Sequence, residues 1–302
     1  MLLIQQRVSS AGDPAQITFK ENIMQQFTPL TNEQIRSVAP SVFATAPWEQ
    51  VSDRYQFVPT FQVIDALREE GFMPVRAMQS RTRIPGKRDF TKHMLRFRSV
   101  NIAAPSAVGD SVPEIVLTNS HDRRRCRGRG SGYKLDLGIF RMVCSNGLVV
   151  KSSDYGSMQV PHFGKDVLSR IIEGTYHILD DAESVMDKVQ NWGAIRMADE
   201  ERMLLAETVH EYLYPKADDR DHPAPFAPGK LLNVRRHADI KNDLWTTTNV
   251  IQENVIRGGI RGFSSSGRLT RTRAVTSVNS ELSLNKAIWA MAEKFAELKS
   301  VQ

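Results

Sequence analysis

The sequence DVLSRIIEGTYHILDDAESVMDKVQNW, residues 166–192, carries the clearest secondary-structure signal in the chain. Its apolar side chains recur every three or four residues, at positions 168, 171, 172, 178, 179, 182, 185, 186 and 189. This spacing predicts a single helix of about seven turns. A near-heptad pattern also allows a coiled-coil contact between copies, and hence a homo-oligomer. Thr175 and Ala182 weaken that seam, so packing across the protein's own sheet is favoured.

Strand-like runs dominate the chain before this helix. Runs of β-branched, aromatic and alternating residues end at Gly, Asn or Pro, and they fall at 54–58, 72–79, 94–102, 113–117, 133–143 and 147–151. Between the first two runs, Thr60 is placed to cap a helix that ends at Gly71. Further upstream, Thr31 and Gln34 fit a capping box, which predicts a short helix to about Val38.

Helical patterns dominate the chain after residue 192. Helices are predicted at 199–212, from a cap at Asn242 to Gly258, and at 279–299, with a Pro-rich loop at 215–228. The predicted fold class is α+β, with a β-rich N-terminal unit containing a crossing helix, followed by a helical C-terminal unit. The expected boundaries are an N-terminal segment at 1–50, the β-rich core at 51–160 and the helical unit at 161–302.

Composition narrows the class of protein. The chain has 302 residues, of which 41% are hydrophobic and 25% charged, as in ordinary globular proteins. We find no apolar run long enough to span a membrane and no secretory signal at the start, so a cytoplasmic protein with no membrane partner is expected. With only Cys126 and Cys144, a disulfide framework is excluded, and reduced thiols are expected.

Positive charge is concentrated in three segments, at residues 81–98, 122–134 and 257–273. They contain 18 of the 40 basic residues and two of the 34 acidic residues, which leaves 22 basic and 32 acidic residues elsewhere. A chain that needed charge only for solubility would intersperse the two signs. This separation is typical of a surface that binds a polyanion.

Nucleic acid is the predicted partner, because arginine and lysine neutralise phosphates and the intervening Gly and Ser residues let a backbone approach them closely. Nearby Phe90, Phe97, Tyr133 and Phe263 favour single-stranded DNA, whose bases stack on such rings. The predicted nucleic-acid-binding residues are Arg81, Arg83, Lys87, Arg88, Lys92, Arg96, Arg123, Arg124, Arg125, Arg127, Arg129, Arg257, Arg261, Arg268, Arg271 and Arg273. Other polyanions, acidic protein partners and plain solvated loops remain alternatives.

Six short motifs also occur, in order, in one protein family: TKHMLR at 91–96, NSHD at 119–122, FRMVCSNGL at 140–148, NDLW at 242–245, QEN at 252–254 and RTRAV at 271–275. Through them the chain, over about residues 20–297, resembles the domain of unknown function 932 family, the YfjQ/YafZ-like set. The resemblance implies a bacterial mobile-element setting, a plasmid or prophage, where DNA processing, replication accessory work and evasion of host defence are common roles. Together with the basic segments and their aromatics, this setting gives the expected function: an accessory protein of a mobile element that binds single-stranded DNA and anneals or protects it. The basic loop at 123–130 departs from the family, which has a short Gly/Ser turn there.

The sequence offers three other candidate functions. His121, Asp122 and Cys144 resemble parts of a cysteine hydrolase or nuclease, although Cys144 lies in an apolar strand where an inert buried thiol is commoner. The histidines lack the close spacing of a zinc site, so no metal is predicted, and no Walker loop or other cofactor motif is present. The third alternative is a binding protein that inhibits a host defence factor. An enzyme is therefore the less favoured class.

Overall fold

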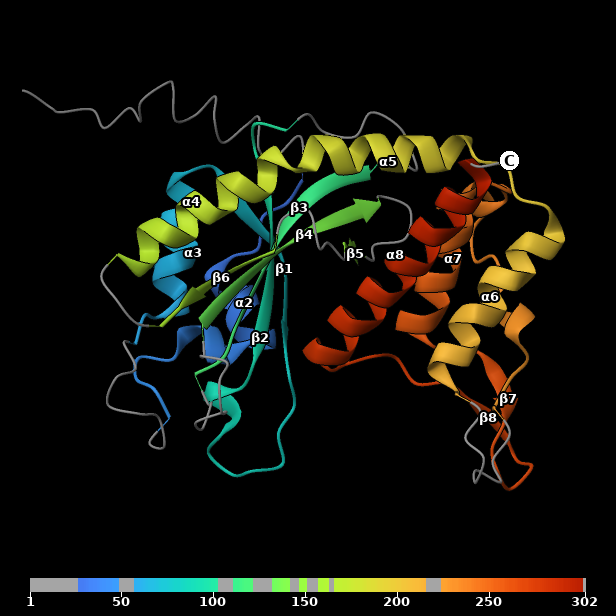
Figure 1. Ribbon diagram of the computed structural model, residues 1–302. Coiled ribbons are helices and arrows are strands. Elements are labelled where there is room, and N and C mark those ends of the chain that lie inside the picture. The colour runs from blue at the N-terminus through green and yellow to red at the C-terminus, as the bar shows by residue number, and fades with distance from the viewer. Residues whose placement is uncertain are drawn as a thin grey trace, which may run out of the picture.

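An antiparallel sheet forms the N-terminal half of the computed structural model, which describes residues 27–48, 57–102, 111–121, 132–141, 147–150, 157–162, 166–215 and 224–300. Helices form the C-terminal half (Figure 1). The predicted α+β class is thus confirmed. Among the described residues, no helix is both long and apolar enough to cross a membrane.

Four long strands run antiparallel in chain order, and two short strands pair with the fourth. They are β1 (Phe72–Gln79), β2 (His93–Ser99), β3 (Ser111–Asn119), β4 (Gly132–Arg141), β5 (Gly147–Val149) and β6 (Ser157–Pro161). Five of these correspond to predicted runs, whereas β6 was not predicted. In the predicted run at 54–58, residues 54–56 lie outside the described residues, and 57–58 are not in a strand.

The two faces of the sheet carry different side chains, because successive residues of a strand point to opposite sides. Leu95 and Phe97 belong to the main hydrophobic core, which also contains residues of α3 (Thr60–Glu69) and α4 (Val167–Asp180). Met94 packs on the other face in a smaller cluster with Val278, at the start of α8 (Val278–Ser300).

The predicted seven-turn helix is two helices in the structure. α4 ends at Asp180 and α5 (Ala182–Ala194) begins after Asp181 (Figure 1). Two adjacent aspartates at the end of α4 are unfavourable beside the negative end of that helix. Asp181 and Glu183 are favourable beside the positive end of α5. The apolar stripe continues across the break, which is why periodicity alone predicts one helix.

The other α-helices in the described residues are α2 (Asn32–Val38), α6 (Asp199–Leu213) and α7 (Leu244–Arg257). The capping box at Thr31 is confirmed. The cap of α7 is Asp243, not Asn242, because the Asp243 carboxylate accepts a hydrogen bond from the Thr246 N–H at 2.7 Å. Every residue of α7 from 244 to 256 is buried.

Three tryptophans join the helices into one core. The ring centres of Trp192 (α5) and Trp289 (α8) lie 4.5 Å apart, and Trp245 (α7) lies 6.2 Å from Trp192. The same hydrophobic cluster continues into the sheet. A small hairpin of β7 (Arg261–Phe263) and β8 (Leu269–Arg271) then projects from this helical layer (Figure 1).

Candidate nucleic-acid interface

The first basic segment begins where β1 ends, in a loop whose ends are held together by the Ser80 N–H bond to the Lys92 carbonyl at 2.8 Å. Within this loop Arg81, Arg83 and Arg88 are exposed. None of the three forms an ion pair with a residue that the structure describes. Their charges are therefore open to an external anion.

These three arginines line an open pocket of about 790 Å³. Its other walls come from the end of β1, from Val38 and Pro40, and from Thr276, which lies between β8 and α8. The Lys92 ammonium donates to the Asn279 side chain at 2.7 Å, on the same side of the fold. The chain that leaves the third basic segment therefore runs beside the first.

The second basic segment lies largely outside the described residues, including Arg123, Arg124, Arg125, Arg127 and Arg129. The strand ends that flank it are described. Asn119 at the end of β3 pairs with His93 at the start of β2, and β4 begins at Gly132. The connection from β3 to β4 therefore starts and finishes at the same end of the sheet as the loop at 80–92.

The third basic segment contains the β7–β8 hairpin, which is not among the elements predicted from the sequence. Arg261 lies directly opposite Arg271, and Phe263 lies opposite Leu269. All four side chains are exposed, as are Arg268 and Arg273. The alternating pattern Arg261-x-Phe263 and Leu269-x-Arg271, on either side of a Ser-Ser-Ser-Gly turn, was the signal that could have identified this hairpin.

The other face of the hairpin packs on the protein. The Phe263 N–H donates to the Pro225 carbonyl at 2.8 Å. A Cβ atom at Gly262 would lie 1.9 Å from the same carbonyl oxygen, so only glycine fits there. In Figure 1 the hairpin and the loop after β1 project from the same side of the molecule, opposite α4 and α5.

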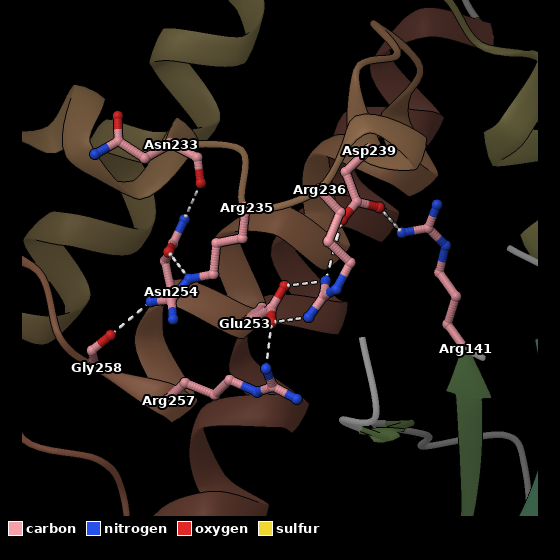
Figure 2. Close-up of polar contacts among 9 residues, drawn as sticks. All are labelled: Arg141, Asn233, Arg235, Arg236, Asp239, Glu253, Asn254, Arg257 and Gly258. Atoms are coloured by element: carbon pink, nitrogen blue, oxygen red, sulfur yellow. Dashed lines mark hydrogen bonds and ion pairs between the residues drawn. The ribbon is translucent and has the colours of Figure 1, made fainter. Parts of the chain in front are cut away.

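A network of polar contacts fixes the chain where the hairpin starts (Figure 2). The Arg235 guanidinium donates to the Asn254 side-chain oxygen at 2.8 Å and to the Gly258 carbonyl at 2.5 Å. Asn254 in turn donates to the carbonyls of Leu231 and Asn233. Gly258 has a φ of 63° and ends α7, as its predicted role at the close of the helix requires.

Two buried carboxylates hold three arginines in the same network (Figure 2). Glu253 accepts from both terminal nitrogens of Arg236 and pairs with Arg257 at 3.0 Å. Asp239 pairs with Arg141 and, at 3.2 Å, with Arg236. The hydrogen bond to Glu253 raises the pKa of Arg236 above its ordinary value. Arg257, predicted to bind nucleic acid, is 38% exposed and is already engaged by Glu253.

Arg96 does not belong to the exposed surface, which corrects its predicted role. Its side chain is 1% exposed, and its Nε lies 2.5 Å from a carboxylate oxygen of Glu114. Arg98 pairs with the other oxygen of Glu114 at 2.8 Å. Because β2 lies between β1 and β3, neither residue is on a sheet edge. A buried arginine in an ion pair cannot reach a phosphate.

The aromatic residues also differ from expectation. Phe97 and Tyr133 are buried. Phe90 is half-buried, with its ring centre 5.2 Å from that of Trp48. Of the four aromatic residues used to favour single strands, only Phe263 is exposed.

His121, the predicted base of a hydrolase, lies in a buried polar cluster. The Thr60 hydroxyl lies 3.2 Å from His121 Nε2 and 3.0 Å from His93 Nε2. Thr60 is therefore not the cap of α3 that the sequence predicts; the residue at the cap position is Pro59. Burial, reinforced by the charges of His93 and His162, lowers the pKa of His121 to about 2. The imidazole is neutral at pH 7, and its full burial keeps it from a substrate in solution.

The other two predicted hydrolase residues, Asp122 and Cys144, lie outside the described residues. Within the described ranges, no group of three or more His, Cys, Asp or Glu side chains is arranged to hold a metal ion. The candidate site that the described residues do assemble is the surface formed by the exposed arginines of the loop at 81–88 and of the β7–β8 hairpin.

Known proteins and a family model both match this chain over most of its length. UPF0380 protein YafZ and UPF0380 protein YfjQ, both from Escherichia coli (strain K12), are each 40% identical over 272 residues, covering 90% of this chain and 93% of the relative. No solved structure matches significantly. The model of the family described as "Domain of unknown function (DUF932)" matches residues 47–289, and the description names no activity. The chain therefore belongs to the DUF932 family.

Proposed function

We propose that the protein binds nucleic acid, with a preference for single-stranded DNA, through the loop at 81–88 and the β7–β8 hairpin. The observation that carries this proposal is a set of exposed arginines in two segments that project from the same side of the molecule (Figure 1): Arg81, Arg83, Arg88, Arg261, Arg268, Arg271 and Arg273. None of them forms an ion pair with a carboxylate among the described residues. A phosphate chain is the polyanion that such a surface fits.

The hairpin adds a second argument. Like charges directly opposite each other on paired strands are destabilising, and Arg261 and Arg271 are such a pair. A bound phosphate between or beside them would remove that repulsion. Lys87, Lys92 and Arg257 lie next to these groups, so they can strengthen the local positive potential without donating to phosphate themselves.

The preference for single strands rests on Phe263, because an exposed ring beside arginines offers a base a stacking surface. Arg123, Arg124, Arg125, Arg127 and Arg129 lie outside the described residues and stay part of the proposal, because the ends of β3 and β4 that flank them lie at the same end of the sheet as the first loop. The setting implied by the family resemblance, an accessory protein of a mobile element, belongs to the same proposal.

A salt titration tests the binding. We expect a labelled single-stranded oligonucleotide to bind with a log affinity that falls linearly with log salt, by about 0.7 per phosphate contact. The double variant Arg81→Gln/Arg83→Gln should lower that slope by about 1.4 if each arginine contacts one phosphate. Fluorescence anisotropy at several salt concentrations measures both quantities.

The matched control removes two arginines from other parts of the fold, Arg170→Gln on α4 and Arg196→Gln after α5. This variant loses the same net charge, so a change in slope confined to Arg81 and Arg83 reports contacts rather than overall charge. Equal effects of the two double variants, or no binding of the wild type at about 50 mM salt, would refute the proposal.

A further inference from the structure

The outward face of the β7–β8 hairpin places two large apolar side chains beside its arginines. Phe263 is 62% exposed and Leu269 is 73% exposed, and the two are directly opposite. Arg261 and Arg271 are two residues away on the same strands, so they lie on the same face, about 7 Å along the hairpin. The face is thus an apolar pair next to a cationic pair.

The packing of the inner face fixes this orientation. Gly262 lies against Pro225 so closely that no side chain fits, and the Phe263 N–H bonds to the Pro225 carbonyl. Phe263 cannot turn inward without losing this contact. A single exposed apolar residue is common on soluble proteins, but two placed opposite each other among arginines indicate a partner that is both anionic and apolar.

We propose that this face contacts unstacked bases of the bound strand, with Phe263 and Leu269 against base faces and Arg261 and Arg271 against the flanking phosphates. The inference rests on the proposed nucleic-acid binding and adds the contacting groups. A nucleotide combines a flat apolar base with a charged phosphate, which matches the two halves of the face. Aromatic side chains stack on any base, so the contact does not depend on sequence.

The test uses the full-length protein and a single-stranded oligonucleotide carrying 2-aminopurine, whose fluorescence changes when its stacking changes. Wild type should bind and change the fluorescence. Phe263→Ala/Leu269→Ala should bind about 5- to 150-fold more weakly, the loss expected for one stacked base, and should abolish the fluorescence change. Its salt slope should remain that of wild type, because the phosphate contacts remain.

Three further variants separate stacking from charge and from general effects. Phe263→Tyr keeps an aromatic ring and should retain the fluorescence change. Arg261→Gln/Arg271→Gln should lower the salt slope by about 1.4. Leu298→Ala removes an equally exposed apolar side chain, 66% exposed near the end of α8, and should have no effect.

The outcomes distinguish this inference from the proposed function. Wild-type binding with a fluorescence change that persists in Phe263→Ala/Leu269→Ala would overturn the base contact and leave the nucleic-acid binding standing. No wild-type binding would overturn both. Circular dichroism of each variant excludes misfolding as the cause of a loss.

Discussion

Glu253→Gln probes the buried ion cluster that supports the hairpin. The Glu253 carboxylate is 3% exposed and accepts from Arg236 and Arg257. Glutamine keeps the shape of the side chain but removes its charge. It also replaces one acceptor oxygen with an NH2 group, which is a donor that faces the N–H donors of the guanidinium groups. Removing one partner of a buried ion pair typically costs about 3–5 kcal/mol.

Two features of the cluster place the expected cost at the lower end of that range. Arg257 is 38% exposed, so water solvates part of its charge once the ion pair with Glu253 is removed. Arg236 keeps its pairing with Asp239 at 3.2 Å. We therefore expect the free energy of unfolding to fall by about 3 kcal/mol. Urea unfolding followed by tryptophan fluorescence measures it, because Trp245 lies on α7 itself and Trp192 and Trp289 pack against it in the core.

The matched control is Glu297→Gln, which breaks an exposed pair with Lys294 on α8. Exposed pairs contribute about 0–1 kcal/mol, so this variant should be close to wild type in stability. If Glu253→Gln lost no more than Glu297→Gln, the carboxylate would be solvated in the folded protein. The account of the cluster as a buried anchor would then be wrong.

Two further outcomes are expected. Burial holds the pKa of His121 at about 2 in the folded protein, below the unfolded value near 6.5. The contribution of this histidine to the free energy of unfolding is therefore complete above pH 6.5. It is lost as pH falls, by about 1.4 kcal/mol at pH 5.5. Unfolding from pH 7.5 to 5.5 should show this fall in wild type and in the exposed-site variant His177→Gln, but a smaller one in His121→Gln; equal pH dependence in all three would contradict it. Gly262→Ala should cost about 1–3 kcal/mol by displacing the hairpin from Pro225, whereas Gly193→Ala, with open space on α5, should be neutral or stabilising. Thermal unfolding compares the two glycine variants, and a neutral Gly262→Ala would mean that the hairpin does not pack as described.

Local chemistry made much of the fold predictable. The capping box at Thr31 and the end of a helix at Gly258 are decided by a few adjacent residues, and both hold in the structure. The strand predicted from Phe72 to Gln79, directly after the glycine that ends a helix, is likewise present as β1. Such signals need no knowledge of distant partners, which is why they can be predicted from one sequence.

The parts that could not be predicted depend on partners far along the chain. Arg96 was assigned by charge density, but its burial follows from its place on a central strand and from Glu114 on the next one. Thr60 was assigned as a cap because of its position before a helix, whereas its hydroxyl meets His93 and His121. A count of charges or a local pattern contains no information on which face of a sheet a residue occupies.

The contacts of α8 with the sheet have a consequence for how the chain is made. The Lys286 ammonium on α8 donates to buried Asp136 on β4 at 2.5 Å, and Glu281 on α8 pairs with Arg76 on β1. Both contacts form only after α8, which is encoded long after these strands, has been made. Until α8 leaves the ribosome, Met94 and Val116 lack the helix residues that cover them. During synthesis the nascent sheet therefore presents an apolar face that a chaperone can bind, and this face is covered only after α8 has been translated.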